Sequence, residues 1–108
     1  MDSSKFSIER NNSTERTVLS LKGNLTSMNA INFKKELLDV IEVDNKDCHI
    51  DISGIDSMDL TGVNALAVAH SKSKALGNEM VIISSIANPA EELLFLTKFI
   101  DVFTFQRA

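Results

Sequence analysis

The sequence contains no tryptophan and no tyrosine, and it has one cysteine and one proline in 108 residues. A core without Trp or Tyr must be built from aliphatic side chains and the six phenylalanines, and binding by aromatic stacking is not expected. A single cysteine can form neither a disulfide framework nor a cysteine-based metal site. Because Cys48 lies in an apolar run, we expect it to be a buried, reduced thiol.

Clusters of basic residues and long apolar runs are also missing. The formal net charge is −4 and the pI is about 5.0. Nucleic-acid binding is therefore disfavoured, whereas a basic or mixed-charge protein partner is compatible with the composition. Apolar runs such as 80–83 and 93–96 are four residues long, far shorter than a membrane span. Residues 1–5 are polar and carry no targeting segment, so we expect a cytoplasmic protein without membrane contact.

The hydrophobic pattern predicts a single α/β domain over residues 1–108. Two short strands at 6–9 and 18–22, separated by a turn signal, predict an antiparallel pair, and Gly23 is expected to close the second strand. Helices and strands then alternate, which predicts right-handed crossovers and parallel pairing. The expected fold is a mixed, mostly parallel sheet of four to five strands packed with three to four helices.

A first helix is expected from Ser27, with Thr26 or Ser27 capping it through a hydroxyl, and the polar run at 44–47 ends it. Its inner face is formed by residues at helical spacing: Ala30, Phe33, Leu37, Val40 and Ile41. Strands follow at 48–52 and 80–83, and a second helix at 61–76 ends before Gly77, which can adopt the left-handed conformation.

A third helix is expected to begin at Asn88, which caps it, with Pro89 in the first position and Glu91 reaching back to the cap. Its predicted apolar face consists of Leu93, Leu94, Leu96 and Phe99. Residues 102–105 suggest a final short strand.

The segment 48–77 is the most informative part of the chain, because a strand, a sharp connection and a helix start follow one another there. Asp59 is placed to cap the helix by accepting from the backbone N–H of Thr61 or Gly62. The Thr61 hydroxyl then lies in the first turn, either as a helper of the cap or as a site of covalent modification. Gly62 is a poor helix former, costing about 1 kcal/mol relative to alanine. Its presence suggests that something approaches the backbone closely.

Catalytic patterns are weak in this sequence. His49 and His70 are the only histidines, and neither has a cysteine or carboxylate nearby at metal-ligand spacing. No glycine-rich phosphate loop and no Gly-x-Ser-x-Gly elbow occurs. An enzyme that uses Asp51, Asp56 or Asp59 stays a minor alternative, since no nucleophile, base and electrophile set can be assembled. We therefore expect no catalysis, no metal and no cofactor.

Residues 51–63, Asp-Ile-Ser-Gly-Ile-Asp-Ser-Met-Asp-Leu-Thr-Gly-Val, resemble the signature of the STAS domain. In that family an apolar strand ends in Asp-Leu-Ser, and Asp-Ser-Ser-Gly-Leu then opens a helix. Residues 21–25 resemble the family's Gly-x-Leu-Asp turn, residues 77–83 resemble its glycine and buried strand, and the segment from Asn88 to residue 103 fits its C-terminal region. The resemblance covers nearly the whole chain. Such domains occur in bacterial anti-sigma factor antagonists, stressosome proteins and sulfate transporter tails.

The resemblance implies a phosphorylation switch. In antagonists of this family, the second hydroxyl residue of Asp-Ser-Ser-Gly is phosphorylated by a serine/threonine kinase that is itself the anti-sigma factor. Phosphorylation separates the two proteins, and a phosphatase would restore binding. The resemblance implies that Thr61 is the phosphoacceptor. The partner-binding residues that it implies are Asp59, Leu60, Gly62, Asn24 and Thr26.

The sequence departs from the family pattern at two of these positions. Leu60 replaces a serine, and Thr26 stands where an aspartate is usual. These departures keep open a second hypothesis, a STAS-like scaffold or small-ligand-binding domain, as in stressosomes, that is not phosphorylated.

Overall fold

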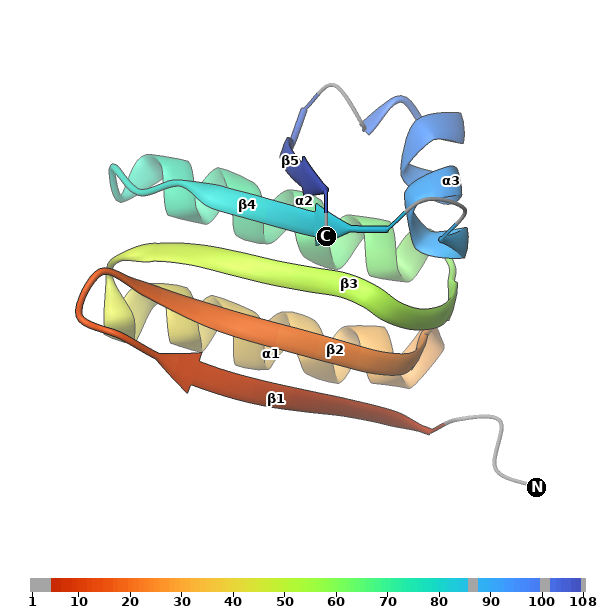
Figure 1. Ribbon diagram of the computed structural model, residues 1–108, viewed down its shortest axis with the longest axis horizontal. Coiled ribbons are helices and arrows are strands. Elements are labelled where there is room, and N and C mark those ends of the chain that lie inside the picture. Colours follow the sequence, from red (N-terminus) through yellow and green to blue (C-terminus); the bar gives the residue numbers. More distant parts are fainter. Residues whose placement is uncertain (1–4, 86–87, 100–101, 108) are drawn as a thin grey trace.

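The computed structural model describes residues 5–85, 88–99 and 102–107. Within these residues five strands form one sheet in the order β1-β2-β3-β4-β5, together with three α-helices (Figure 1). The elements are, in chain order, β1 (Phe6–Asn12), β2 (Arg16–Leu25), α1 (Ser27–Asp44), β3 (Asp47–Met58), α2 (Leu60–Ala75), β4 (Met80–Ser84), α3 (Pro89–Leu96) and β5 (Thr104–Arg107). β1 is antiparallel to β2 and the other pairs are parallel, which confirms the predicted fold class.

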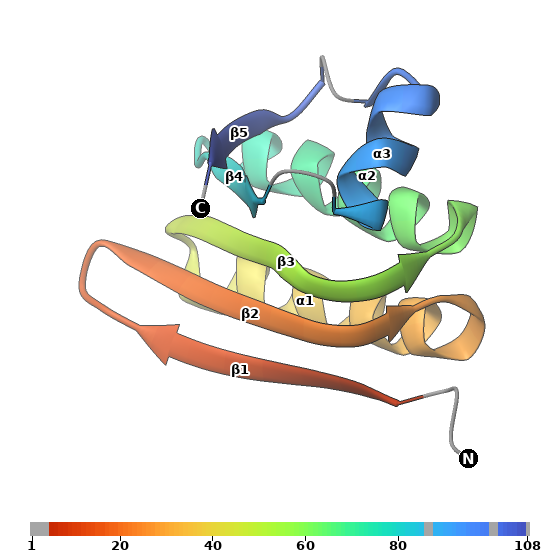
Figure 2. The same cartoon turned by 45° about the vertical axis from the view of Figure 1, so that its right-hand side comes forward.

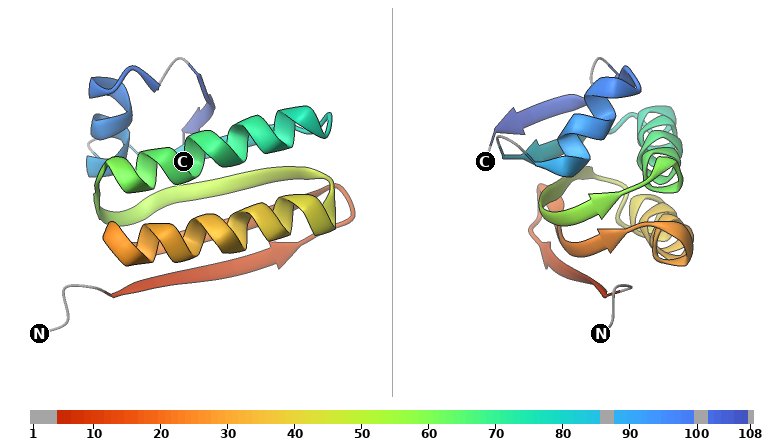
Figure 3. Two further views of the ribbon diagram at one scale, coloured as in Figure 1. Left: turned by 180° about the vertical axis from the view of Figure 1, so that it is seen from behind. Right: turned by 90° about the vertical axis from the view of Figure 1, so that its right-hand side faces the viewer.

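Helices α1 and α2 lie side by side over one face of the sheet (Figure 3). The five α1 residues predicted to face inward are all buried, and Cys48, Ile50 and Ile52 of β3 pack beneath the helices in the same core. The left-handed residue after α2 is Gly77, as predicted, with φ of 80°. Residues 1–4, expected to carry no targeting segment, and residues 100–101 lie outside the described residues.

Strand β3 is longer than predicted and there is no sharp connection after Ile52. β3 pairs with β2 as far as Met58, but it pairs with β4 only as far as Asp51 (Figure 2). β2 is longer too: Gly23 does not close it but lies within it, at φ of 99°. A glycine with no Cβ allows this irregular backbone inside a strand, and sequence alternation alone did not reveal it.

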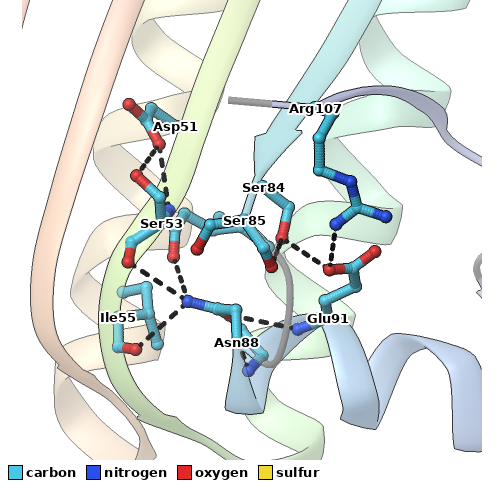
Figure 4. Close-up of polar contacts among 10 residues, drawn as sticks. Asp51, Ser53, Ile55, Ser84, Ser85, Asn88, Glu91 and Arg107 are labelled. Atoms are coloured by element: carbon cyan, nitrogen blue, oxygen red, sulfur yellow. Dashed lines mark hydrogen bonds and ion pairs between the residues drawn. The ribbon is translucent and has the colours of Figure 1, made fainter.

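Helix α3 takes the place of a neighbouring strand beside the second half of β3. Asn88 caps α3, as predicted, by accepting from the N–H of Ala90 (2.9 Å) and of Glu91 (3.2 Å). Its amide nitrogen donates to the β3 carbonyls of Ile52 (3.0 Å) and Ser53 (3.2 Å) (Figure 4). The buried Asn88 side chain therefore satisfies β3 backbone groups beyond the point where β4 ends.

Two predictions about α3 and its neighbourhood are wrong. The Glu91 carboxylate does not reach back to the cap; it accepts from the Ser84 hydroxyl (3.1 Å) and from the Arg107 guanidinium (2.6 Å) (Figure 4). Leu96 is exposed and not part of the inner face, whereas Leu94 is fully buried. The final strand exists but is displaced, because β5 spans Thr104–Arg107 and pairs with β4 from Val81 onward.

At the other end of the molecule, one carboxylate links α1 with β1 and β2. Asp44, at the end of α1, accepts two hydrogen bonds from the Arg10 guanidinium of β1, at 2.8 and 2.7 Å. It accepts a third, at 2.6 Å, from the buried hydroxyl of Thr17 in β2. The Thr17 hydrogen bond and the Arg10 charge hold the pKa of Asp44 below its usual range, because both favour the ionised carboxylate.

We expect Asp44→Asn to lower the free energy of unfolding by about 1–2 kcal/mol at pH 7, because charge-assisted hydrogen bonds are lost. The folded pKa lies below the unfolded value of about 3.9, so this stabilisation is complete above that value and disappears as the pH falls through the folded pKa. Urea unfolding at about pH 7 and about pH 2.5 measures this difference in the free energy of unfolding. The exposed Asp39→Asn on the same helix is the control, and equal losses for the two variants would contradict the prediction.

Candidate functional site

The candidate site lies where β2 and β3 pass into their helices. Leu25 and Met58 are paired in the sheet and are the last residues of the two strands. One residue separates each strand from its helix, Thr26 before α1 and Asp59 before α2. The helix starts therefore lie next to each other at one end of the molecule (Figures 1 and 3).

The Asp59 carboxylate joins these two helix starts. As the predicted N-cap of α2, it accepts from the N–H of Gly62 at 3.1 Å through Oδ1. Its other oxygen, Oδ2, accepts from the N–H of Ser27 at 3.0 Å. Thr26 occupies the N-cap position of α1 without a side-chain cap, so the prediction of a hydroxyl cap there is wrong. An aspartate 32 residues further along the chain supplies the bond instead.

Polar residues of the strands form further hydrogen bonds at this corner of the molecule, where the two helices start. The Ser57 hydroxyl of β3 donates to the Asn24 side-chain oxygen at 2.8 Å. The Asn29 amide of α1 donates to the Asn24 backbone carbonyl at 3.0 Å. Asn24 thereby links β2, β3 and the first turns of α1, and its side chain is half-buried. The predicted residues Asn24, Thr26 and Asp59 are thus brought together, with Leu60 and Thr61 directly beside them.

Thr61 is half-buried in the first turn of α2. In the described part of the chain its hydroxyl has no hydrogen-bond partner, since Asp59 performs the capping. The interpretation of Thr61 as a helper of the cap is therefore not what the structure shows. Its hydroxyl is available for other chemistry.

Gly62 is buried, and the close approach that its presence suggested comes from the chain itself. A Cβ at position 62 would lie 2.6 Å from the carbonyl oxygen of Leu25 and 2.6 Å from Cγ of Met58. The absence of a side chain allows the start of α2 to pack against the ends of β2 and β3. A direct contact between Gly62 and a partner stays a prediction.

Apolar side chains project into solvent around these helix starts. Leu60 is 66% exposed and Met28, in the first turn of α1, is 61% exposed. Ile31, one turn further along α1, is 40% exposed. Large exposed apolar side chains next to a polar, well-braced corner are typical of protein-interaction surfaces.

The residues considered for catalysis lie in separate environments. Asp51 accepts from the N–H and the hydroxyl of Ser53, at 2.9 and 2.6 Å (Figure 4). Asp56 is exposed. The His70 ring packs edge-to-face against the Phe103 ring, with the ring centroids 5.4 Å apart. Burial raises the pKa of the Cys48 thiol to about 12, so this free cysteine stays protonated. Among residues 5–85, 88–99 and 102–107 no group of three metal-ligating side chains gathers.

Comparison with protein families identifies the class of the protein. The model of the STAS domain matches residues 5–108, and the chain belongs to this family. A comparison with curated protein sequences gives no match. No helix in the described ranges has the length and apolar character needed to cross a membrane.

Several solved structures share the fold. A candidate anti-sigma factor antagonist from Thermotoga maritima has a TM-score of 0.80 and 18% identity over 94% of this chain and 86% of that one. An anti-sigma factor antagonist from Mycobacterium paratuberculosis has a TM-score of 0.79 and 15% identity, with coverage of 94% and 85%. SpoIIAA of Bacillus, in its phosphorylated form, has a TM-score of 0.73 and 15% identity, with coverage of 96% and 91%. The chain therefore shares its fold with these anti-sigma factor antagonists.

Removal of the Asp59 carboxylate should loosen both helix starts at once. We expect Asp59→Ala to lower the free energy of unfolding by about 1–2 kcal/mol, because a capping side chain is lost. Amide hydrogen exchange should speed up at Ser27 and at Gly62 together, although these residues belong to different helices. Asp56→Ala, at an exposed position near the end of β3, is the control. Unchanged exchange at Ser27 in Asp59→Ala would show that the bridge is unimportant.

A side chain at position 62 should be costly. We expect Gly62→Ala to destabilise the fold by about 1–3 kcal/mol, since the Leu25 carbonyl is backbone and cannot move away freely. The higher helix propensity of alanine offsets only part of this loss. Chemical denaturation measures it, with the exposed Ser71→Ala of α2 as the control. A stabilised Gly62→Ala protein would refute the packing argument.

Proposed function

We propose that the protein is a cytoplasmic regulator that acts as an anti-sigma factor antagonist. It binds an anti-sigma factor that is also a serine/threonine kinase, and phosphorylation of Thr61 releases it. The observation that carries this proposal is the Thr61 hydroxyl, which is not used for capping and directly follows the capping Asp59 and the exposed Leu60 in the chain. A phosphatase would return the protein to its binding form.

The comparisons support the proposal at the level of the fold. SpoIIAA has been solved in an unphosphorylated and in a phosphorylated form, and this chain matches them with TM-scores of 0.72 and 0.73. The fold of that relative therefore exists in both states. By analogy, a phosphate on Thr61 acts through the surface that a partner touches rather than through unfolding.

The chemistry of the surface explains how a phosphate would prevent binding. Leu60 and Met28 offer a partner apolar contact area on either side of the helix starts. A phosphate adds a charge of about −1.5 to −2 at neutral pH, and its burial against an apolar partner surface is unfavourable. The Asp59 carboxylate adds a second negative charge close by. Binding is then weakened while both helices stay capped.

A scaffold without a switch is the second candidate. The observation that favours it is Leu60, whose apolar side chain is two-thirds exposed at a position where the family usually has a serine. In such a scaffold the apolar surface binds its partner constitutively, and the charge at position 61 has little effect.

Substitutions at position 61 separate the two candidates. We expect Thr61→Glu to weaken binding to the anti-sigma factor kinase at least about tenfold, which corresponds to 1.4 kcal/mol. Thr61→Gln, which has the same size without the charge, should weaken it much less. Calorimetric titration measures both, and Thr61→Ala should bind while resisting release by ATP. If Thr61→Glu and Thr61→Gln bind equally well, the scaffold is correct.

Phosphate mapping tests the chemical step directly. After incubation with the kinase and ATP, mass spectrometry should place one phosphate on Thr61. The neighbouring hydroxyls of Ser57 and Ser27 serve as internal controls, because Ser57 is already bonded to Asn24. An unmodified Thr61, in a protein that the kinase still binds and releases, would rule out the switch.

A further inference from the structure

Side chains of α1 and α2 pair across the line where the two helices meet, here called the seam, and the pairs have a constant sequence offset. The two helices run side by side in the same direction (Figure 3). Lys34 of α1 donates to the side-chain oxygen of Asn64 in α2 at 3.2 Å, a pair 30 residues apart in sequence. Two turns further along, Glu42 of α1 lies 3.6 Å from Lys72 of α2 with the same offset. The stripe of α2 that faces α1 therefore includes Asn64 and Lys72.

Thr61 belongs to this stripe. Residues three positions apart lie on the same face of a helix, with Cβ atoms about 5–6 Å from each other. Thr61 is three residues before Asn64, so it lies on the seam one turn closer to the helix start. Lys34 leans the same way, because helical side chains point back toward the N-terminus of their own helix. The Lys34 ammonium is bonded to Asn64, and Thr61 lies one turn from Asn64 on the same face of α2.

Among the described residues, no carboxylate forms an ion pair with Lys34. In the described part of the chain its polar contact is the neutral amide of Asn64, and its side chain is half-buried in the seam. The other charged side chains of this region lie in different surroundings. Lys35 is exposed, Glu36 lines a groove next to β1, and Asp59 lies at the start of α2.

Two backbone N–H groups next to Thr61 are already engaged by Asp59. The N–H of Gly62 is bonded to the Asp59 carboxylate, and the N–H of Val63 is bonded to the Asp59 carbonyl at 3.1 Å. A phosphate on Thr61 would meet the negative charge of Asp59 on one side and the positive charge of Lys34 on the other. These opposite charges favour a phosphate directed along the seam, away from the cap.

We propose that Lys34 is the residue that binds the phosphate of phosphorylated Thr61, exchanging the Asn64 amide for a phosphate oxygen. This inference rests on the proposed function in taking Thr61 as the phosphoacceptor. The resulting ion pair connects α1 with α2 and leaves the Asp59 bridge intact. Lys34 thereby stabilises the released form of the protein, at a position that no motif of the sequence singles out.

The test uses the 108-residue chain with phosphothreonine incorporated at position 61 during synthesis, so that no kinase or partner is required. Phosphorus NMR then measures the second pKa of the phosphate. An ammonium group nearby favours the dianion, so Lys34→Gln should raise this pKa by roughly 0.2–0.7, the range that corresponds to a partly exposed ion pair. The rise should shrink in about 1 M salt, where charges are screened.

The adjacent Lys35→Gln is the matched control, since it removes the same charge from the exposed side of α1. It should change the phosphate pKa by less than half as much. Equal shifts for the two variants, or no shift for Lys34→Gln, would overturn the proposal. Chemical denaturation of unmodified Lys34→Gln confirms that the variant is folded. Because the phosphate is installed synthetically, a kinase that ignores Thr61 would refute the proposed function and leave this result standing.

Discussion

The corner of the molecule that carries Thr61 depends on one carboxylate. Asp59 accepts from the N–H of Gly62 in α2 and from the N–H of Ser27 in α1, so one side chain determines how two parallel βα units begin. This is possible because each unit passes from strand to helix through a single residue, and because Leu25 and Met58 are paired in the sheet. The absence of a side chain at Gly62 completes the arrangement by allowing α2 to pack against the Leu25 carbonyl. The Thr61 hydroxyl is available only because the capping is done elsewhere.

Local patterns were sufficient for the class of fold. Apolar spacing in α1 identified all five of its buried residues, and Asn88 with Pro89 located the start of α3. Patterns failed where long-range contacts decide the structure. The length of β3 depends on its pairing with β2, and Gly23 stays within its strand at a positive φ. Leu96 has helical spacing but no neighbour to bury it, because α3 packs mainly through Leu94 and Ala90.

The same distinction applies to the site. The roles of Asp59 as cap and of Thr61 as a first-turn residue follow from a few consecutive residues, and they were predictable. The bond from Ser27 to Asp59 spans 32 residues, and the contact of Lys34 with Asn64 spans 30. Neither leaves a local signal in the sequence, since each requires that two helices lie parallel at a given register. Gly62 was noticed as unusual, but its neighbour is the chain's own backbone, which only the packed structure reveals.

The replacement of a strand by α3 also has a consequence for the behaviour of the protein in solution. Beyond Asp51, β3 has no β4 beside it, and its carbonyl groups would form an open sheet edge. Such an edge is a template on which a second chain can add a strand and begin to aggregate. Asn88 occupies the carbonyls of Ile52 and Ser53, and a helix cannot be extended by strand pairing. A helix cap therefore also occupies backbone groups of β3 on which another strand could otherwise pair.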